Sequence, residues 1–169
     1  MKLVGRGIAV IVLLSGITAV SVWAQQRADV ERVRQRLIGS YKLISYISYD
    51  QNGTATKLPY SAGQISYDAA GRMSAQLMRA DRPKLAPGSP ASEAERAAAY
   101  SSYIAYFGHY EIDAEKSIVY HHVEGSISQN MVESAMPRHY ELSPDGASLF
   151  LSVKNGERVV GRLQWDRYK

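Results

Sequence analysis

The 169-residue chain contains no cysteine. Disulfides, thiolate metal ligands and thiol nucleophiles are therefore excluded. The sequence also lacks a phosphate-binding glycine loop, a Gly-x-Gly-x-x-Gly fingerprint after a strand and a Gly-x-Ser-x-Gly nucleophile elbow. These absences argue against nucleotide binding and serine hydrolase chemistry, and no cofactor is predicted.

A strong excess of one charge is also missing. The chain has 20 basic and 16 acidic residues, and two of the basic ones, Lys2 and Arg6, precede a long apolar run. Without these two, 18 basic and 16 acidic residues give a net charge of +2. This is too small to indicate a nucleic acid or an anionic membrane surface as a partner. No pattern indicates an oligomeric state.

The N-terminal segment has the layout of a secretory signal. Its two basic residues precede an apolar run over residues 7–22, which ends in the small residue Ala24 before Gln25. An uncleaved membrane anchor is the alternative, because roughly 20 apolar residues span a bilayer. Polar residues within the run favour the signal. We predict a signal peptide at 1–24 and a mature domain at 25–169, periplasmic or secreted, with no stable membrane span after cleavage.

The rest of the chain alternates short β-type stretches with turn signals such as Asn52-Gly53 and Ser143-Pro144-Asp145-Gly146. The expected strands cover about 39–49, 64–67, 72–79, 106–112, 117–124, 136–143, 149–153 and 158–168. About eight strands joined by tight turns pair antiparallel, and a closed meander leaves no exposed edge. The fold class predicted is all-β, an up-and-down antiparallel barrel, with a two-sheet sandwich as the alternative. An eight-stranded barrel is filled by side chains or holds one small ligand.

Two helices interrupt the β pattern. A short N-terminal helix is predicted over Ala28–Leu37, with Asp29 as its N-cap. A capping box of Ser92 and Glu95 opens an inserted helix that is expected to reach Ile104. The helical spacing predicts a buried face that covers one barrel end, or a lid over a ligand, formed by Tyr100, Tyr103, Ile104 and Phe107.

Three passages together resemble the lipocalin-like domain family of small bacterial and fungal β-barrels. They are Leu37–Leu43, Gly63–Ala75, and the set Tyr106–Ile112, His121–Ser126, Asn130, Arg138 and Trp165–Arg167. Tyr41 stands where the family usually has tryptophan, and no proline lies beside Asn130. The resemblance implies a calyx for a small hydrophobic or amphiphilic molecule, but it implies no reaction. In a closed barrel Arg167 would also lie over the Tyr41 ring, as a structural latch.

The adjacent residues His121 and His122 must point to opposite faces of their strand, because strand side chains alternate. The neighbouring valines favour His121 inside, whereas Ile118 and Tyr120 keep the opposite orientation open. His122 shares a face with Glu124, and the preceding strand could bring His109 towards it, but His-x-His and His-Glu-x-x-His patterns are absent. We therefore predict no metal site, and either histidine could simply be satisfied in the core or at the rim.

Arg138 shares its strand face with Met136, Tyr140 and Leu142. An arginine that points inward with them needs an anionic partner: a ligand carboxylate, a ligand enolate or Glu124. An arginine that faces water is the alternative. His121 could exchange a proton with the same ligand, since a histidine pKa lies near working pH. The further ligand-binding candidates are Tyr103, Tyr110, Asn130 and Tyr140.

These observations predict an exported barrel that binds a small hydrophobic or amphiphilic molecule. A cofactor-independent cyclase or isomerase that uses the same cavity is the main alternative, with His121 as the candidate acid or base. An interaction module with a solidly packed barrel is the third possibility. Whether the protein is an enzyme, which molecule it binds and whether the interior is open stay undecided by the sequence.

Overall fold

The computed structural model describes residues 12–84, 88 and 90–169, and the side chains from Ser21 onward. Lys2 and Arg6, on which the export prediction partly rests, lie outside the described residues. The elements are α1 (Val12–Leu37), β1 (Gly39–Tyr49), β2 (Ala55–Lys57), β3 (Tyr60–Tyr67), β4 (Arg72–Arg79), α2 (Glu93–Ser101), β5 (Tyr103–Asp113), β6 (Ile118–Ser126), a 3-10 turn (Gln129–Met131), β7 (Ala135–Leu142), β8 (Ser148–Asn155) and β9 (Arg158–Arg167).

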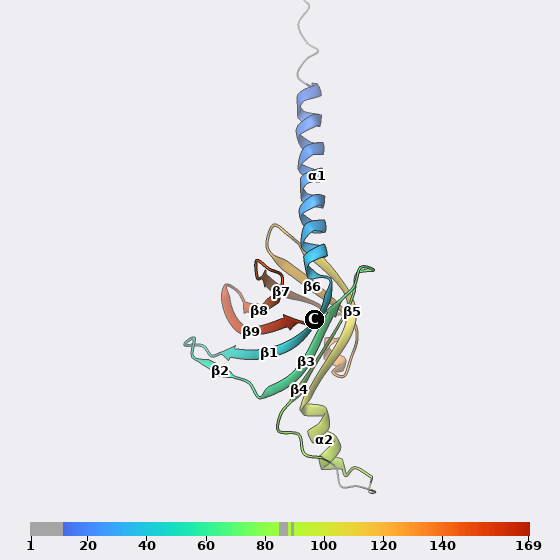
Figure 1. The fold of residues 1–169 in the computed structure, drawn as a ribbon, viewed down its shortest axis with the longest axis vertical. Helices are drawn as coiled ribbons and strands as arrows, with labels where there is room; N and C mark the ends of the chain where they lie inside the picture. The colour runs from blue at the N-terminus through green and yellow to red at the C-terminus, as the bar shows by residue number, and fades with distance from the viewer. Residues whose placement is uncertain (1–11, 85–87, 89) are drawn as a thin grey trace, which may run out of the picture.

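Eight of the described strands close into an antiparallel barrel (Figure 1). Consecutive strands from β3 to β9 pair in order, β3 pairs with the first half of β1, and β9 returns to pair with β1 from Tyr41–Arg167 to Ser48–Gly161. The short strand β2 pairs only with the second half of β1. The up-and-down barrel is therefore confirmed, and the β1–β9 pairing rules out the two-sheet sandwich.

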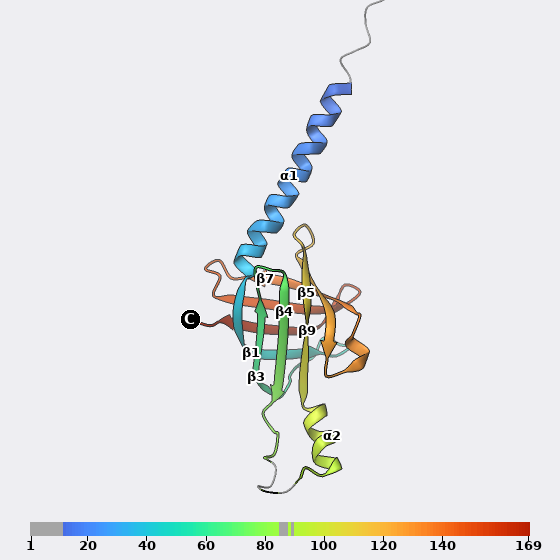
Figure 2. The same cartoon turned by 90° about the vertical axis from the view of Figure 1, so that its right-hand side faces the viewer.

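Helix α1 is longer than the sequence predicted. It begins at Val12 rather than near Ala28 and runs without interruption past Ala24, so the prediction of a short helix is wrong. The apolar N-terminal run continues the helical conformation into the amphipathic segment. Figure 2 shows α1 extending away from one end of the barrel. Among the residues that the structure describes, no helix has both the length and the hydropathy needed to cross a bilayer.

The junction of α1 with the barrel is built by Tyr41 and Arg167. The Tyr41 hydroxyl donates to the carbonyl of Leu37 (2.9 Å), and Arg167 donates to the carbonyls of Arg36 and Ile38 (both 2.7 Å). These bonds satisfy carbonyl groups that a helix end leaves without partners. Leu37 itself is fully buried. The helix end thus closes one end of the barrel, which we call the α1 end.

Helix α2 differs from its prediction at the C-terminal side. The capping box of Ser92 and Glu95 is confirmed, but the helix ends at Ser101 and buries none of its residues. Tyr103 and the residues after it belong to β5, where Tyr103 pairs with Met78. The predicted buried helical face is therefore wrong, because backbone pairing with β4 competes successfully with helix continuation. Tyr100 is 53% exposed, and α2 extends away from the barrel opposite α1 (Figure 2).

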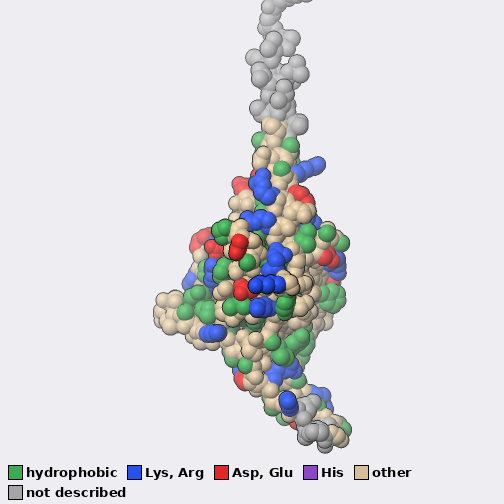
Figure 3. Space-filling view, in the orientation of Figure 1, with side chains coloured by type: hydrophobic (Ala, Val, Ile, Leu, Met, Phe, Trp, Pro, Cys, Tyr) green, Lys and Arg blue, Asp and Glu red, His purple; other side chains and the backbone are tan. Residues whose placement is uncertain are grey.

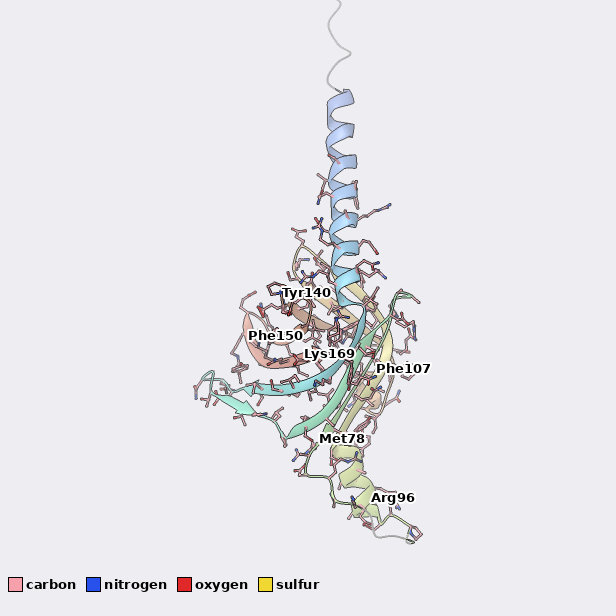
Figure 4. The ribbon with its side chains drawn as sticks, in the orientation of Figure 1. Met78, Arg96, Phe107, Tyr140, Phe150 and Lys169 are labelled. Carbon is pink, nitrogen blue, oxygen red and sulfur yellow. The ribbon has the colours of Figure 1, made fainter. Side chains whose placement is uncertain are left out.

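The barrel core is continuous from the α1 end to the middle of the barrel. Its largest fully buried side chains are Trp165, Tyr41, Tyr67, Leu37, Ile65, Leu149, His121 and Val119. Basic and acidic side chains are interspersed with apolar ones on the face that Figure 3 shows. Phe107, which is 53% exposed, lies on the outer side of β5 (Figure 4). One histidine is thus part of an otherwise mostly aromatic and aliphatic interior.

Candidate functional site

The inward-facing row of β6 consists of Val119, His121 and Val123, which are all at most 3% exposed. His121 is therefore the inward histidine, as the neighbouring valines favoured, and His122 lies on the outer face. A β-bulge between β5 and β6 makes Phe107 pair with Gly125 while Gly108 pairs with Val123. The bulge leaves Glu124 without a Cα partner on β5, and strand alternation places it on the outer surface next to the buried Val123.

Two tyrosine hydroxyls hold the buried imidazole. The Tyr67 hydroxyl lies 2.7 Å from Nε2 of His121, and the Tyr106 hydroxyl lies 3.0 Å from Nδ1. The three side chains come from β3, β5 and β6, so the barrel closure brings them together. We call Tyr67, His121 and Tyr106 the interior polar chain. Both ring nitrogens are satisfied, which fixes the orientation of the imidazole ring.

The ionisation of this chain is set by burial. Desolvation lowers the pKa of His121 well below its usual value, and the positive charge of Arg138 lowers it further. Burial also raises the pKa of Tyr67 well above its usual value. The pKa of Tyr106 is raised by burial, against the opposing charge and hydrogen bonding of Arg138. All three groups are therefore neutral near pH 7.

Arg138 lies on the inward-facing row of β7, paired with the buried Val119 of β6, and is itself half-buried. Its Nη1 donates to the carbonyl of Pro137 (2.9 Å), and its Nη2 contacts Sδ of Met136 (3.4 Å). Among the described side chains, no carboxylate lies within ion-pairing distance of it. The guanidinium thus acts on His121 and Tyr106 from a partly buried position without a protein counter-ion.

Glu124, the protein acid that could have paired with Arg138, is committed elsewhere. Its carboxylate accepts two hydrogen bonds from Arg72 (both 2.7 Å) and lies 2.9 Å from Nδ1 of His109. These contacts hold the pKa of Glu124 at about 2. The whole group lies on the outer surface. A protein partner for Arg138 from this position is therefore excluded.

His122, a second outer histidine, completes a surface cluster with His109. The rings of His109 and His122 stack with their centroids 4.6 Å apart, and Nε2 of His122 lies 3.3 Å from Glu111. Within the described part of the chain, no group of three or more histidine and carboxylate side chains is arranged to hold a metal ion. Stacked rings whose nitrogens already face carboxylates form a surface network instead.

The barrel end opposite α1, which we call the distal end, also carries partly buried apolar side chains. These side chains pack against the core: Tyr46, Tyr60, Ile104, Met131 and Met136. The rings of Tyr46 and Tyr60 lie 5.8 Å apart, where β1 leaves β3 to pair with β2. Burial raises the pKa of Tyr46, and the positive charge of Arg138 opposes this shift, so the guanidinium lies near this aromatic pair.

Of the other predicted ligand-binding residues, Tyr110 is the Cα partner of His121 across β5 and β6, and Tyr140 shares a strand face of β7 with Arg138, whereas Asn130 and Tyr103 lie apart from this pair. Tyr110 is buried near the α1 end, where its hydroxyl donates to the carbonyl of Asp68 (2.8 Å), and Tyr140 lies near Ser117 at the same end. Asn130 is exposed in the 3-10 turn, and Tyr103 lies beneath Arg82 near α2. The structure therefore brings together His121 and Arg138, while a ligand role for the other four stays a prediction.

Sequence reasoning missed the two tyrosines of the interior polar chain. Tyr67 follows Ile65 on the inward row of β3, and Tyr106 precedes Tyr110 on the inward row of β5. Strand alternation alone could have placed both inside the barrel. Their convergence on His121 depends on the register across the barrel, which no local pattern encodes.

Open grooves also lie outside the barrel, on both sides of α1. One of about 730 Å³ is lined by residues that include Trp23, Val30 and Arg34, and one of about 850 Å³ by residues that include Val22 and Val33. The predicted signal segment contributes Trp23 to the first groove and Ser21 and Val22 to the second. The other lining residues of both grooves lie after Ala24.

One buried donor remains without a partner in the interior. The Nε1 atom of Trp165 is the sole buried side-chain nitrogen or oxygen among the described residues that makes no hydrogen bond. Trp165 is 1% exposed and lies on the inward row of β9. A buried N–H without an acceptor costs about 1–3 kcal/mol. An acceptor bound inside the barrel would therefore be stabilised there.

The fold and site define a class: a closed eight-stranded antiparallel barrel with a neutral polar chain and a counter-ion-free arginine on its inner face. The model of the lipocalin-like domain family matches residues 38–168. The chain therefore belongs to this family, as the sequence motifs indicated. A comparison with curated proteins finds no match.

Proposed function

We propose that this protein is exported and binds one small amphiphilic molecule, with an apolar body and an acidic oxygen, in the distal half of its barrel. The observation that carries the proposal is the partly buried guanidinium of Arg138, for which the described residues supply no carboxylate. A charge in this position is costly unless it is paired. A ligand anion supplies the missing partner.

The surroundings of Arg138 support an apolar ligand body. The partly buried side chains of the distal end are aromatic or thioether groups, and thioethers adapt readily to ligands of irregular shape. The neutral interior polar chain lies deeper in the barrel and adds hydrogen-bonding groups without adding charge. This combination suits an amphiphile better than a highly charged metabolite.

A fluorescence titration with anilinonaphthalene sulfonate, an apolar anion, tests the proposal. We expect saturable binding at one site and about tenfold weaker binding in Arg138→Gln, which corresponds to about 1.4 kcal/mol. Arg158→Gln is the matched control, because it removes the same charge from an exposed residue whose side chain donates to the carbonyl of Asp50. Equal affinities in the two variants, or no saturable binding, would refute the proposal and favour a solidly packed barrel.

The interior polar chain also favours a second function, a cofactor-independent cyclase or isomerase that acts on the same ligand. His121 contacts two hydroxyls that could relay a proton. Proton transfer through these three side chains needs no metal ion. His121→Gln keeps a polar side chain but removes the titratable ring. If the variant binds the ligand normally and loses turnover, the protein is an enzyme; if wild-type protein returns the ligand unchanged, it is a carrier.

Support for export comes from the exposed position of the N-terminal part of α1. Val22 and Trp23 are each 65% exposed, whereas the last turn of the helix is fixed to the barrel. Removal of residues 1–24 would therefore leave the barrel contacts of α1 in place. The intact mass of the protein recovered from its native host tests this. We expect a chain that begins at Gln25, and a full-length chain would contradict export with cleavage.

A further inference from the structure

The interior polar chain contains more hydroxyl hydrogens than its own contacts can use. A neutral imidazole has one N–H and one bare nitrogen. One tyrosine must therefore donate to His121, and the other must accept from it. The tyrosine that accepts keeps its own hydroxyl hydrogen for another partner.

Burial decides which tyrosine donates. Tyr67 is 2% exposed, and among the described residues its hydroxyl has a hydrogen-bond contact only with Nε2 of His121. If it accepted from Nε2–H, its own hydrogen would be buried without an acceptor, which is unfavourable. If it donates to Nε2, every hydrogen on this side is used. The imidazole hydrogen then lies on Nδ1 and is donated to the Tyr106 oxygen, 3.0 Å away.

Tyr106 is consequently the member of the chain with a spare hydroxyl hydrogen. Its oxygen accepts from His121, whose Cα partner on β7 is Met136, two residues from Arg138 on the same strand face. The guanidinium therefore lies beside Tyr106, and its charge and hydrogen bonding act on that hydroxyl. Hydrogen bonds accepted by a hydroxyl oxygen polarise its O–H group and make it a stronger donor. Tyr106 and Arg138 therefore present two hydrogen-bond donors at neighbouring positions, and an anion could accept from both.

We propose that the Tyr106 hydroxyl and the Arg138 guanidinium together bind one oxyanion, the enolate or phenolate oxygen of a planar, mainly apolar ligand. The inference rests on the proposed function and narrows its ligand class. Two donors that meet at one acceptor suit a single oxygen. Nη1 of Arg138 donates to the carbonyl of Pro137, and Nη2 contacts Sδ of Met136. These contacts occupy part of the pair of guanidinium nitrogens that a carboxylate would use for two parallel hydrogen bonds.

The shape of the neighbouring side chains agrees with a planar ligand. The Tyr46 and Tyr60 rings lie 5.8 Å apart at the distal end, and both Tyr46 and Tyr106 are influenced by the charge of Arg138. Aromatic rings of this kind pack against a flat conjugated body. A conjugated oxyanion spreads its charge into such a body, so the ligand can be apolar beside the tyrosines and anionic beside the arginine.

The probe for this inference is para-nitrophenol, because its phenolate and phenol forms have distinct visible spectra. We expect wild-type protein to bind the phenolate preferentially and to lower the pKa of the bound dye by about one unit or more. Tyr106→Phe and Arg138→Gln should each weaken phenolate binding about tenfold and move the pKa of the bound dye back towards that of the free dye. Binding of the dye with unchanged ionisation would overturn the inference.

Tyr67 supplies a test of the proposed hydrogen direction. It is a positioning residue, because it acts on Tyr106 through His121 and does not touch the ligand oxygen. In Tyr67→Phe nothing donates to Nε2, so the imidazole hydrogen is no longer confined to Nδ1, and we expect a partial return of the dye pKa. Tyr120→Phe is the matched control, because it removes a tyrosine hydroxyl from the outer face of β6, away from the interior polar chain. Equal dye pKa values in both variants would contradict the hydrogen direction.

Failure of this inference is distinguishable from failure of the proposed function. If anilinonaphthalene sulfonate binds and depends on Arg138, but para-nitrophenolate does not bind, then the site accepts amphiphilic anions and the oxyanion class proposed here is wrong. If neither probe binds, the proposed function itself is wrong. Titrations of wild-type protein with the two probes separate a wrong oxyanion class from absent binding, and only the dependence on Arg138 requires a variant.

Discussion

The guanidinium carbon of Arg167 lies 4.6 Å from the centroid of the Tyr41 ring. This contact joins the last strand of the barrel to the first. The same two side chains also bind the final carbonyls of α1, so one pair of residues fixes both the barrel seam and the orientation of the helix. Barrel closure and the plug at the α1 end therefore depend on each other.

Arg167→Ala should lower the free energy of unfolding by about 2–4 kcal/mol, because it removes a cation–π contact and several charge-assisted hydrogen bonds. Arg167→Lys should recover only part of this loss, since an ammonium cannot reproduce the planar fork. Urea unfolding measures both effects. Arg158→Ala is the control, because Arg158 is exposed and donates to the backbone carbonyl of Asp50. A loss in Arg167→Ala no greater than in this control would contradict the latch.

Gly39 is required beside the latch. Its φ is +144°, and a Cβ built on it would lie 2.1 Å from Nη1 of Arg167. Gly39→Ala should therefore destabilise the fold by about 1–3 kcal/mol, from backbone strain and displacement of the guanidinium. Gly53→Ala is the matched control, because its φ is +81° but no atom lies within 4 Å of the added Cβ.

Unfolding experiments on the double variant separate the two causes at Gly39. In the Arg167→Ala background the displaced guanidinium is absent, so Gly39→Ala should cost less than it does in wild-type protein. Additive losses would show that the two residues are not coupled. The loss from Gly53→Ala should not depend on the residue at position 167.

Local patterns predicted the barrel because its turns carry strong signals. Asn52-Gly53 is one example: Gly53 has the left-handed φ that the turn between β1 and β2 needs. The Arg167–Tyr41 contact was predictable as well, because closure of an up-and-down barrel necessarily brings its first and last strands together. In both cases the information lies in a few adjacent residues or in topology alone.

The errors arose where two local preferences compete. Tyr103 continues the apolar spacing of the inserted helix, but it can also pair with Met78, and only the tertiary context decides in favour of the strand. The interior polar chain was missed for a related reason. Alternation places Tyr67, Tyr106 and His121 inside the barrel. Their contact depends on the relative registers of β3, β5 and β6, and β3 pairs with neither of the other two strands.

The buried His121 should make the protein less stable in mild acid. Its pKa is lowered in the folded protein by burial and by the charge of Arg138, so the unfolded chain binds a proton more tightly than the folded chain does. Its contribution to stability is therefore complete above the unfolded value of about 6.5 and is lost as the pH falls from there towards the folded pKa. The loss can reach about 1.4 kcal/mol for each pH unit.

Urea midpoints between about pH 7 and pH 5 measure this slope. His121→Gln should be less stable near neutrality but should show a flatter pH dependence, because the replacement does not titrate. Some slope should remain, since burial also lowers the pKa of His139. An unchanged slope in His121→Gln would show that His121 is not held neutral by the fold.

Glu124 should titrate far below an ordinary glutamate, because Arg72 first and His109 second donate hydrogen bonds to its carboxylate and hold its pKa at about 2. Arg72→Gln should raise this pKa towards the model-peptide value near 4.3, as followed by NMR of the side-chain carboxyl carbon. His109→Gln should raise it less. Arg79→Gln is the control, since its partner is Asp81 rather than Glu124. If Glu124 still titrates near 2 after both substitutions at the outer cluster, neither contact holds its charge. Because the folded pKa is lowered, the contribution of Glu124 to stability is present above its unfolded pKa and is lost as the pH falls towards 2, below the range in which His121 acts.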